Sequence, residues 1–270
     1  DEANSGLTHD YFASVLESFK ETAEKNDYDI TFVNRNRERR RKMTYLEHVR
    51  YRGFDGVVIA CVDFEDPEVA QLVASDIPVV TIDHIFNNRI AVMSDNVKGM
   101  QSLLRYIYSC GHRRIAYIHG HPSSVTGSRL SSFYKTAEEL GLKVPDEYVL
   151  EAGYRDTDGA AAATQQLLAL PCPPTCILYP DDFACLGGMN MLREKGLRIP
   201  EDISIAGYDG LRIGRHMDPK LTTLKQDTQK LGGYAAEKLI SLIEHPKTSV
   251  PEILVVEGEV YEGRSVGNIG

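Results

Sequence analysis

The chain lacks long apolar segments, an excess of positive charge and any sign of an export signal. No run of apolar residues approaches the roughly 20 that a membrane-spanning helix needs, and residues 1–4 do not resemble a signal peptide. The formal net charge is −9, so the chain as a whole does not attract a phosphate backbone. We therefore expect a cytoplasmic protein that has no membrane partner and does not contact nucleic acid directly.

Cysteines are few, and their spacing fits neither a disulfide framework nor a metal site. The chain has 5, an odd number, and most lie in apolar runs, as expected of buried thiols in a reducing compartment. Cys172 and Cys176 could suggest metal binding, but two prolines lie between them and no second pair follows with a nearby histidine. Structural zinc takes about four ligands, so we expect neither a metal nor another cofactor.

Motifs that carry catalysis are also scarce. The sequence has no His-Glu-x-x-His zinc motif and no phosphate-binding loop. The glycine pairs at 187–188 and 232–233 lack the spacing of a dinucleotide-binding fingerprint. We expect no catalytic residues and no enzyme activity.

The pattern of apolar residues predicts alternating helices and strands. Apolar residues recur at helical spacing from Tyr11 onward and again in residues 96–108, 130–137, 158–170 and 231–242. Short continuous apolar runs occupy residues 30–33, 57–60, 79–82, 115–118, 176–179, 203–206 and 253–256. Such runs are typical of parallel strands covered on both faces. Their alternation with helices predicts an α/β fold with parallel sheets.

Two doubly wound parallel-sheet lobes are the natural packing for such a chain, because strand-helix-strand crossovers are right-handed. We expect residues 1–94 and 227–253 to form the amino-terminal lobe and residues 95–226 and 254–270 the carboxyl-terminal lobe, with a ligand cleft between them. A strand is also expected before the helix near Tyr11, and the sequence shows none there. Ligands in such folds bind at the carboxyl ends of strands, which directs attention to Asp83, Asp181 and Asp209.

Five segments of the sequence carry a more specific signal. They are Gly-His-Arg-Arg-Ile-Ala-Tyr-Ile-His-Gly at 111–120, Arg129 near the start of the following helix, Asp-Asp-Phe-Ala at 181–184, the run 196–204 that leads into Gly-Tyr-Asp at 207–209, and Pro-Lys-Leu-Thr-Thr-Leu-Lys-Gln-Asp at 219–227. In this order they resemble the lactose-repressor/galactose-repressor family of bacterial transcription regulators. The resemblance implies a periplasmic-binding-protein-like fold that senses a small effector.

The resemblance also implies a ligand-binding site. Arg129 matches an arginine that grips ligand hydroxyls or carboxylates, and Asp209 matches an aspartate that accepts hydrogen bonds from sugar hydroxyls. A sugar suits this pair because a guanidinium and a carboxylate can each engage two hydroxyls, while an aromatic ring covers the apolar face. The other ligand contacts implied by the resemblance are Asp83 and Gln226 in the pocket wall and the rings of Tyr154 and Tyr11.

Asp181 stands where the family usually has asparagine. We expect Asp182 to cap the helix that follows, because the helical pattern begins directly after it, and Asp181 to face the ligand. An ionised carboxylate only accepts hydrogen bonds, so the ligand would present donors here, which favours a neutral or amino sugar over a phosphate. Each of these candidates also has a simpler interpretation as a turn, cap or packing residue.

One run of basic residues is the only segment that suggests binding to nucleic acid. Arginine and lysine recur between Arg35 and Lys42, at the start of a helix with apolar residues Tyr45, Leu46 and Val49. A solvated helix face explains the run more simply than phosphate contact does. We likewise expect His112 to be a structural residue at the end of a helix.

Two functional hypotheses remain. The first is the effector-binding domain of a transcriptional regulator: a homodimer that binds a sugar or related polyol, undergoes hinge closure, and reaches operator DNA only through a helix-turn-helix domain absent from this chain. The second is an exported sugar-binding protein of a transport system, which shares the fold. The free cysteines and the segment 222–227 favour the first.

Overall fold

A computed structural model describes residues 10–33 and 43–270, and the chain divides into two compact units. Unit 1 comprises residues up to Ser94 together with Asp227–Val256, and unit 2 comprises Asp95–Gln226 and Glu257–Gly270. The expected boundary at 253/254 is wrong, because β9 (Ile253–Val256) pairs in full with a strand of unit 1. The basic run 35–42 lies outside the described residues.

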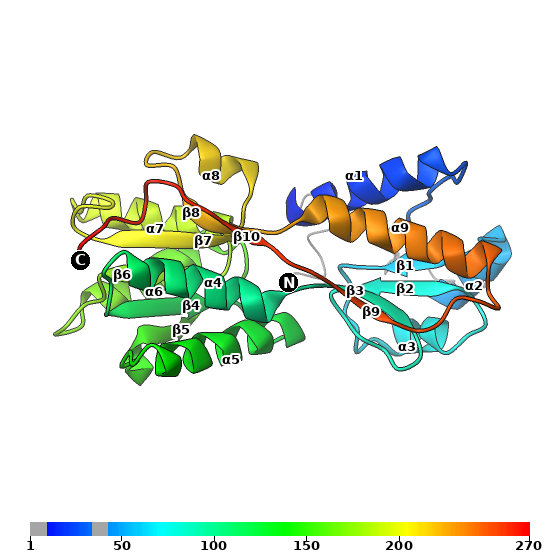
Figure 1. The fold of residues 1–270 in the computed structure, drawn as a ribbon, viewed down its shortest axis with the longest axis horizontal. Helices are drawn as coiled ribbons and strands as arrows, with labels where there is room; N and C mark the ends of the chain where they lie inside the picture. Colours follow the sequence, from blue (N-terminus) through cyan, green and yellow to red (C-terminus); the bar gives the residue numbers. More distant parts are fainter. Residues whose placement is uncertain (1–9, 34–42) are drawn as a thin grey trace. The chain divides into compact units, whose positions relative to one another are not determined.

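Unit 1 is built on a four-stranded sheet in which every neighbouring pair is parallel. The order is β1-β2-β3-β9, where β1 is Val57–Ile59, β2 is Val79–Ile82 and β3 is Ile90–Ser94. Helices α1 (Asp10–Lys25) and α9 (Thr228–Glu244) lie together on one side of this sheet, and α3 (Pro67–Val73) lies on the other (Figure 1). The remaining helix, α2 (Tyr45–Arg52), contacts α3. All residues of β2 are buried, as its continuous apolar run predicts.

Two expectations for unit 1 are wrong. Residues 30–33 form no strand, although they are rich in β-branched residues, and the Phe32 side chain is about half exposed. A strand needs the backbone of a neighbour to pair with, and among the described residues β1 pairs only with β2. Conversely, the sequence pattern missed β3, whose short apolar run fills the centre of the sheet between β2 and β9.

Unit 2 contains a six-stranded sheet of order β10-β8-β7-β6-β4-β5, parallel throughout except for the pair of β10 and β8. The strands are β4 (Ile115–His119), β5 (Val149–Glu151), β6 (Cys176–Leu178), β7 (Ser204–Asp209), β8 (Thr222–Lys225) and β10 (Glu259–Tyr261). The helices are α4 (Asn96–Ser109), α5 (Ser124–Glu139), α6 (Thr157–Leu168), α7 (Asp182–Glu194) and α8 (Arg212–His216). The short strands β5, β8 and β10 were not predicted.

Helices cover both faces of this sheet, which makes it doubly wound. Alternate residues of β4 point to opposite faces: Tyr117 packs with the core residues of α4 and α5, whereas Ile118 packs with those of α6 and α7. The expected α/β class with doubly wound parallel sheets is therefore confirmed. Within the described part of the chain, no helix is long and apolar enough to cross a membrane.

Helices of unit 2 begin just beyond strand ends, and polar side chains cap them. Ser123 caps α5, Asp156 caps α6 and Asp181 caps α7, each accepting a hydrogen bond from the backbone of the first helical turn. Because the carboxyl ends of parallel strands meet at one edge of a sheet, this capping gathers polar groups along that edge. The fold thus places most of the expected site residues of unit 2 near one another.

Candidate functional site

Arg129 is the centre of a buried polar cluster in unit 2. The side chain is only 4% exposed and projects from α5. Its Nε donates to Oδ1 of Asn96 (2.8 Å) and its Nη1 to the carbonyl oxygen of Pro180 (3.1 Å), while the guanidinium carbon lies 3.6 Å from the centre of the Tyr208 ring. Burial opposes the charge, but Tyr208, Tyr154 and Asp209 outweigh it, so the pKa of Arg129 is raised and the group stays cationic.

Asp209 and Gln226 complete the cluster. Oδ1 of Asp209, at the end of β7, lies 3.8 Å from Nη2 of Arg129, which is too far for a direct hydrogen bond. The same oxygen accepts from Nε2 of Gln226 at 2.6 Å. Gln226 is 6% exposed, and its Oε1 is the one buried side-chain oxygen or nitrogen without a hydrogen-bond partner in the described residues. Flipping the side-chain amide of Gln226 would not satisfy this oxygen, because it would then face the carboxylate of Asp209.

Asp181 does not lie as predicted. Its Oδ1 accepts from the backbone N–H groups of Phe183 and Ala184 (both 2.8 Å) and therefore caps α7, and its Oδ2 accepts from the backbone N–H of Arg155 (2.6 Å). The expectation that Asp182 is the cap and Asp181 the ligand contact is thus wrong about the cap. Burial and the nearby Asp209 raise the pKa of Asp181 to about 6, although the three N–H donors oppose that rise.

Asp182 is buried one residue further along and holds the segment that follows β7. Its Oδ2 accepts from the backbone N–H of Leu211 (2.6 Å), and its Oδ1 accepts from the hydroxyl of Thr223 (2.6 Å) on β8. Burial raises the pKa of Asp182 well above its ordinary value. The side chain therefore stabilises the turn through Asp209 and Gly210, a role that the sequence pattern did not predict.

Tyr154 forms an aromatic wall beside Arg129. The centre of its ring lies 5.9 Å from the guanidinium carbon, and its hydroxyl shares a hydrogen bond of 2.8 Å with the hydroxyl of Thr126. A side chain at Gly120 would overlap this ring, since an added Cβ would come within 2.0 Å of it. Position 120 therefore needs glycine to let the ring pack where it does.

The two expected residues of unit 1 contact each other. The hydroxyl of Tyr11 donates to Oδ2 of Asp83 (3.0 Å) and shares a hydrogen bond with the hydroxyl of Ser94 (3.0 Å). Oδ1 of Asp83 accepts from the backbone N–H of Ser94 (2.9 Å). Tyr11 is buried, whereas Asp83 is half-buried. Unit 1 thus has its own polar cluster at the ends of β2 and β3.

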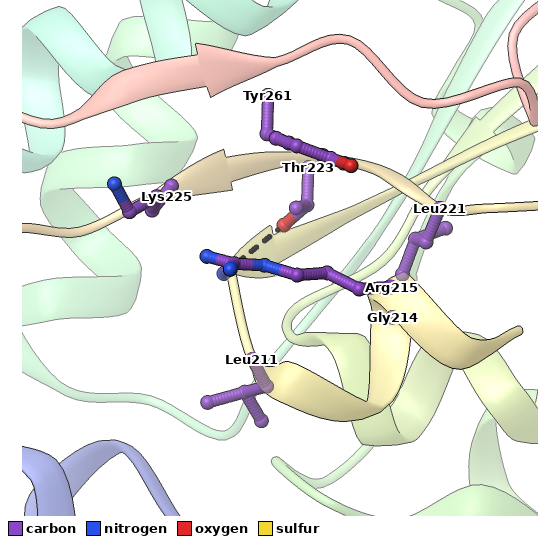
Figure 2. A pocket seen from close by; sticks show the side chains of 8 residues that line it. Leu211, Gly214, Arg215, Leu221, Thr223, Lys225 and Tyr261 are labelled. Atoms are coloured by element: carbon purple, nitrogen blue, oxygen red, sulfur yellow. Dashed lines mark hydrogen bonds between the residues drawn. The ribbon is translucent and has the colours of Figure 1, made fainter.

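A shallow hollow in unit 2 lies apart from these residues. The Arg215 side chain runs along it (Figure 2), and its lining consists of Gly210, Leu211, Gly214, Arg215, Leu221, Thr223, Lys225 and Tyr261. None of the seven expected site residues lines it. Because the hollow has no room for a water molecule, we place the candidate site at the Arg129 cluster.

Known proteins similar to this chain are transcription regulators. Residues 104–266 match the family described as periplasmic binding protein-like domain. The HTH-type transcriptional repressor PurR of Escherichia coli O139:H28 is 30% identical over 265 residues, which cover 96% of this chain and 76% of the repressor. The chain belongs to the LacI family of transcriptional regulators. It is the ligand-sensing domain of such a regulator. The similarity to transcription regulators favours this function over that of an exported sugar-binding protein.

Solved structures confirm the LacI-family fold. A complex of the transcriptional regulator CelR with cellobiose has a TM-score of 0.84 at 23% identity, covering 98% of this chain and 82% of that one. A LacI family regulator from Enterococcus faecium with bound ribose has a TM-score of 0.84 at 23% identity, covering 98% and 97%. At this identity the likeness establishes the fold alone.

Two features of this LacI-family domain were not predicted from the sequence. Asn96 orients Arg129, and no spacing rule could have paired it with a residue on another helix. Residues 263–267 also have the Gly-x-Ser-x-Gly spacing of a hydrolase nucleophile. Ser265 is fully buried, however, donates to the carbonyl oxygen of Ile205 and accepts from the N–H of Thr222, so it holds the carboxyl-terminal segment against the sheet.

Proposed function

We propose that this LacI-family domain senses a neutral, hydroxyl-rich molecule such as a sugar, bound through Arg129, Asp209 and Gln226. The orphaned Oε1 of Gln226 is the observation that supports this most directly. A buried acceptor without a partner costs about 1–3 kcal/mol, and a ligand that donates to it removes that cost. The carboxylate of Asp209 lies beside this oxygen, and Arg129 supplies the cationic group of the cluster.

A hydroxyl group fits this arrangement because it donates and accepts at once. One hydroxyl can accept from Arg129 and donate to Asp209 across the 3.8 Å gap between them, and a neighbouring hydroxyl can donate to Gln226. The single guanidinium is already balanced by the carboxylate of Asp209, so a phosphate would find no surplus positive charge. The cellobiose and ribose in the two related structures agree with this chemistry.

In unit 1, we propose a further ligand contact from Asp83. Its carboxylate is half-buried and held in place by Tyr11 and Ser94. Tyr11 then acts by orienting Asp83 and does not need to touch the ligand.

The regulator role implies partners that we also propose. The domain would act as a homodimer, and ligand binding would change how that dimer presents a helix-turn-helix domain to operator DNA, by analogy with the HTH-type repressor PurR. Ligand binding can bias such an equilibrium only by its difference in affinity for the two states.

Calorimetric titration with ribose, cellobiose and a panel of neutral and phosphorylated sugars tests the proposal. For the sugar that binds, Asp209→Asn and Gln226→Leu should each weaken affinity by about ten- to a hundredfold, the equivalent of a lost hydrogen bond of 1.5–3 kcal/mol. Asp202→Asn is the control, since Asp202 pairs with Arg198 on the exposed surface of the same unit. A response to phosphorylated ligands alone, or unchanged affinity in both site variants, would contradict the proposal.

A further inference from the structure

The Asp181 carboxylate joins two elements of unit 2 that are distant in sequence. One oxygen caps the first turn of α7, and the other accepts from the backbone N–H of Arg155 in the turn between β5 and α6. The side chain is 1% exposed. Both oxygens are therefore engaged by backbone donors, which leaves Asp181 little capacity to serve a ligand directly.

The turn that Asp181 holds has an unfavourable backbone conformation. Arg155 has φ of +58°, in the left-handed region, which is strained for a non-glycine residue. The turn closes through a hydrogen bond of 3.3 Å from the N–H of Asp156 to the carbonyl oxygen of Gly153, and the Arg155 guanidinium lies 4.7 Å from the Phe183 ring on α7. A charge-assisted hydrogen bond to Asp181 offsets that backbone cost.

The residue just before Arg155 is Tyr154, the aromatic wall beside Arg129. We propose that Asp181 is a positioning residue whose ionised carboxylate, through the Arg155 N–H, sets the place of the Tyr154 ring against Arg129 and so contributes to ligand affinity. The part of this proposal that concerns the ligand rests on the proposed function. The part that concerns the turn stands without it.

Only a carboxylate can satisfy both elements. All three partners of Asp181 are N–H donors, whereas an asparagine amide has one oxygen and would turn its NH₂ toward one of them. Asp181→Asn can therefore keep the cap of α7 through its oxygen, but it must give up Arg155. A neutral carboxylic acid has the same limitation, because its O–H cannot accept from Arg155 in the same geometry.

Acidification should therefore act like the substitution. The titratable groups that influence Asp181 are Asp209 at the end of β7 and Asp182 and Cys185 on α7. Burial and Asp209 together raise the pKa of Asp181 to about 6. We therefore expect the link to Arg155 to be present at pH 7.5 and to weaken as the pH falls to 5.

Amide hydrogen exchange on the unliganded protein tests the link. In Asp181→Asn at pH 7.5, the Arg155 amide should exchange about tenfold faster or more, while the Phe183 and Ala184 amides stay within about threefold of the parent. The matched control is Asp66→Asn, which alters the cap of α3 in unit 1 and should leave Arg155 unchanged. An unchanged Arg155 amide, or equal loss of protection at all three amides, would show that Asp181 is only a helix cap.

Two further measurements keep the proposal testable. If Asp181→Asn does not fold, the parent protein alone provides the test. The protection of the Arg155 amide relative to the Phe183 amide, corrected for intrinsic exchange, should fall on acidification with a midpoint near pH 6. A ratio that does not change with pH would refute the link.

In the experiment with ligand, ribose and cellobiose are titrated into both proteins at pH 7.5 and 5. The parent should lose affinity on acidification and Asp181→Asn should not. If no neutral sugar of the panel binds the parent, the proposed function fails, while the exchange result still tests the link.

Discussion

Asp182 offers a sharp test of how unit 2 holds its site. Its two oxygens accept from the Leu211 N–H and the Thr223 hydroxyl, both at 2.6 Å and both buried. Asp182→Ala removes both acceptors and leaves two buried donors without them. Each such loss costs about 1–3 kcal/mol, so we expect the free energy of unfolding of unit 2 to fall by about 3–5 kcal/mol.

Asp182→Asn should behave quite differently. Burial raises the pKa of Asp182 well above its ordinary value, and a protonated carboxyl group has one donor and one acceptor side, as an amide has. The amide oxygen can accept from Leu211 while its NH₂ donates to the oxygen of Thr223. We therefore expect a loss of less than about 1 kcal/mol.

Urea denaturation followed by far-ultraviolet circular dichroism measures both variants, and amide hydrogen exchange assigns the loss to unit 2. Since the folded pKa of Asp182 is raised, its stabilising contribution is present at low pH and is lost as pH rises through that pKa. The parent should therefore lose stability relative to Asp182→Asn as pH rises. Equal costs for the alanine and asparagine variants would refute this account, because they would show that Asp182 is needed as an anion.

The remaining predictions concern three other positions. For Asp181, whose pKa rises from 3.8 to about 6 on folding, the parent should gain about 2 kcal/mol relative to Asp181→Asn between pH 7 and 4, measured by urea denaturation. Gly120→Ala should displace the Tyr154 ring and weaken binding of a responsive sugar about tenfold by calorimetry. Arg89→Met should lower the stability of unit 1 by about 2 kcal/mol, because Arg89 donates to three carbonyl oxygens at and beyond the end of α3; an unchanged exchange pattern there would contradict this.

Elements with long periodic patterns could be predicted from the sequence, whereas short or context-dependent ones could not. The helix α4 and the fully buried strand β2 follow directly from their apolar patterns. The strand β5 has 3 residues and no distinctive pattern. Residues 30–33 have strand-like composition but pair with no strand in the part of the chain that the structure describes, so strand formation depends on partners that a local pattern does not contain.

The candidate site shows the same division. The motifs around Arg129 and Asp209 identified two residues that do lie 3.8 Å apart. Sequence position alone could not decide which of Asp181 and Asp182 caps α7, because the two are adjacent and both precede a helical pattern. The outcome depends on backbone donors from Arg155 and Leu211, which come from turns far along the chain.

The engagement of these carboxylates changes the ligand argument that the sequence suggested. The sequence predicted that Asp181 faces the ligand and that its carboxylate favours a ligand with donors. In unit 2 the oxygens of Asp181 are engaged by backbone donors, and burial favours the neutral form of Asp182. Asp209 is then the carboxylate that faces the guanidinium, and it balances the charge of Arg129. Preference for an uncharged ligand would therefore arise from this pairing together with the orphaned oxygen of Gln226, which needs a donor.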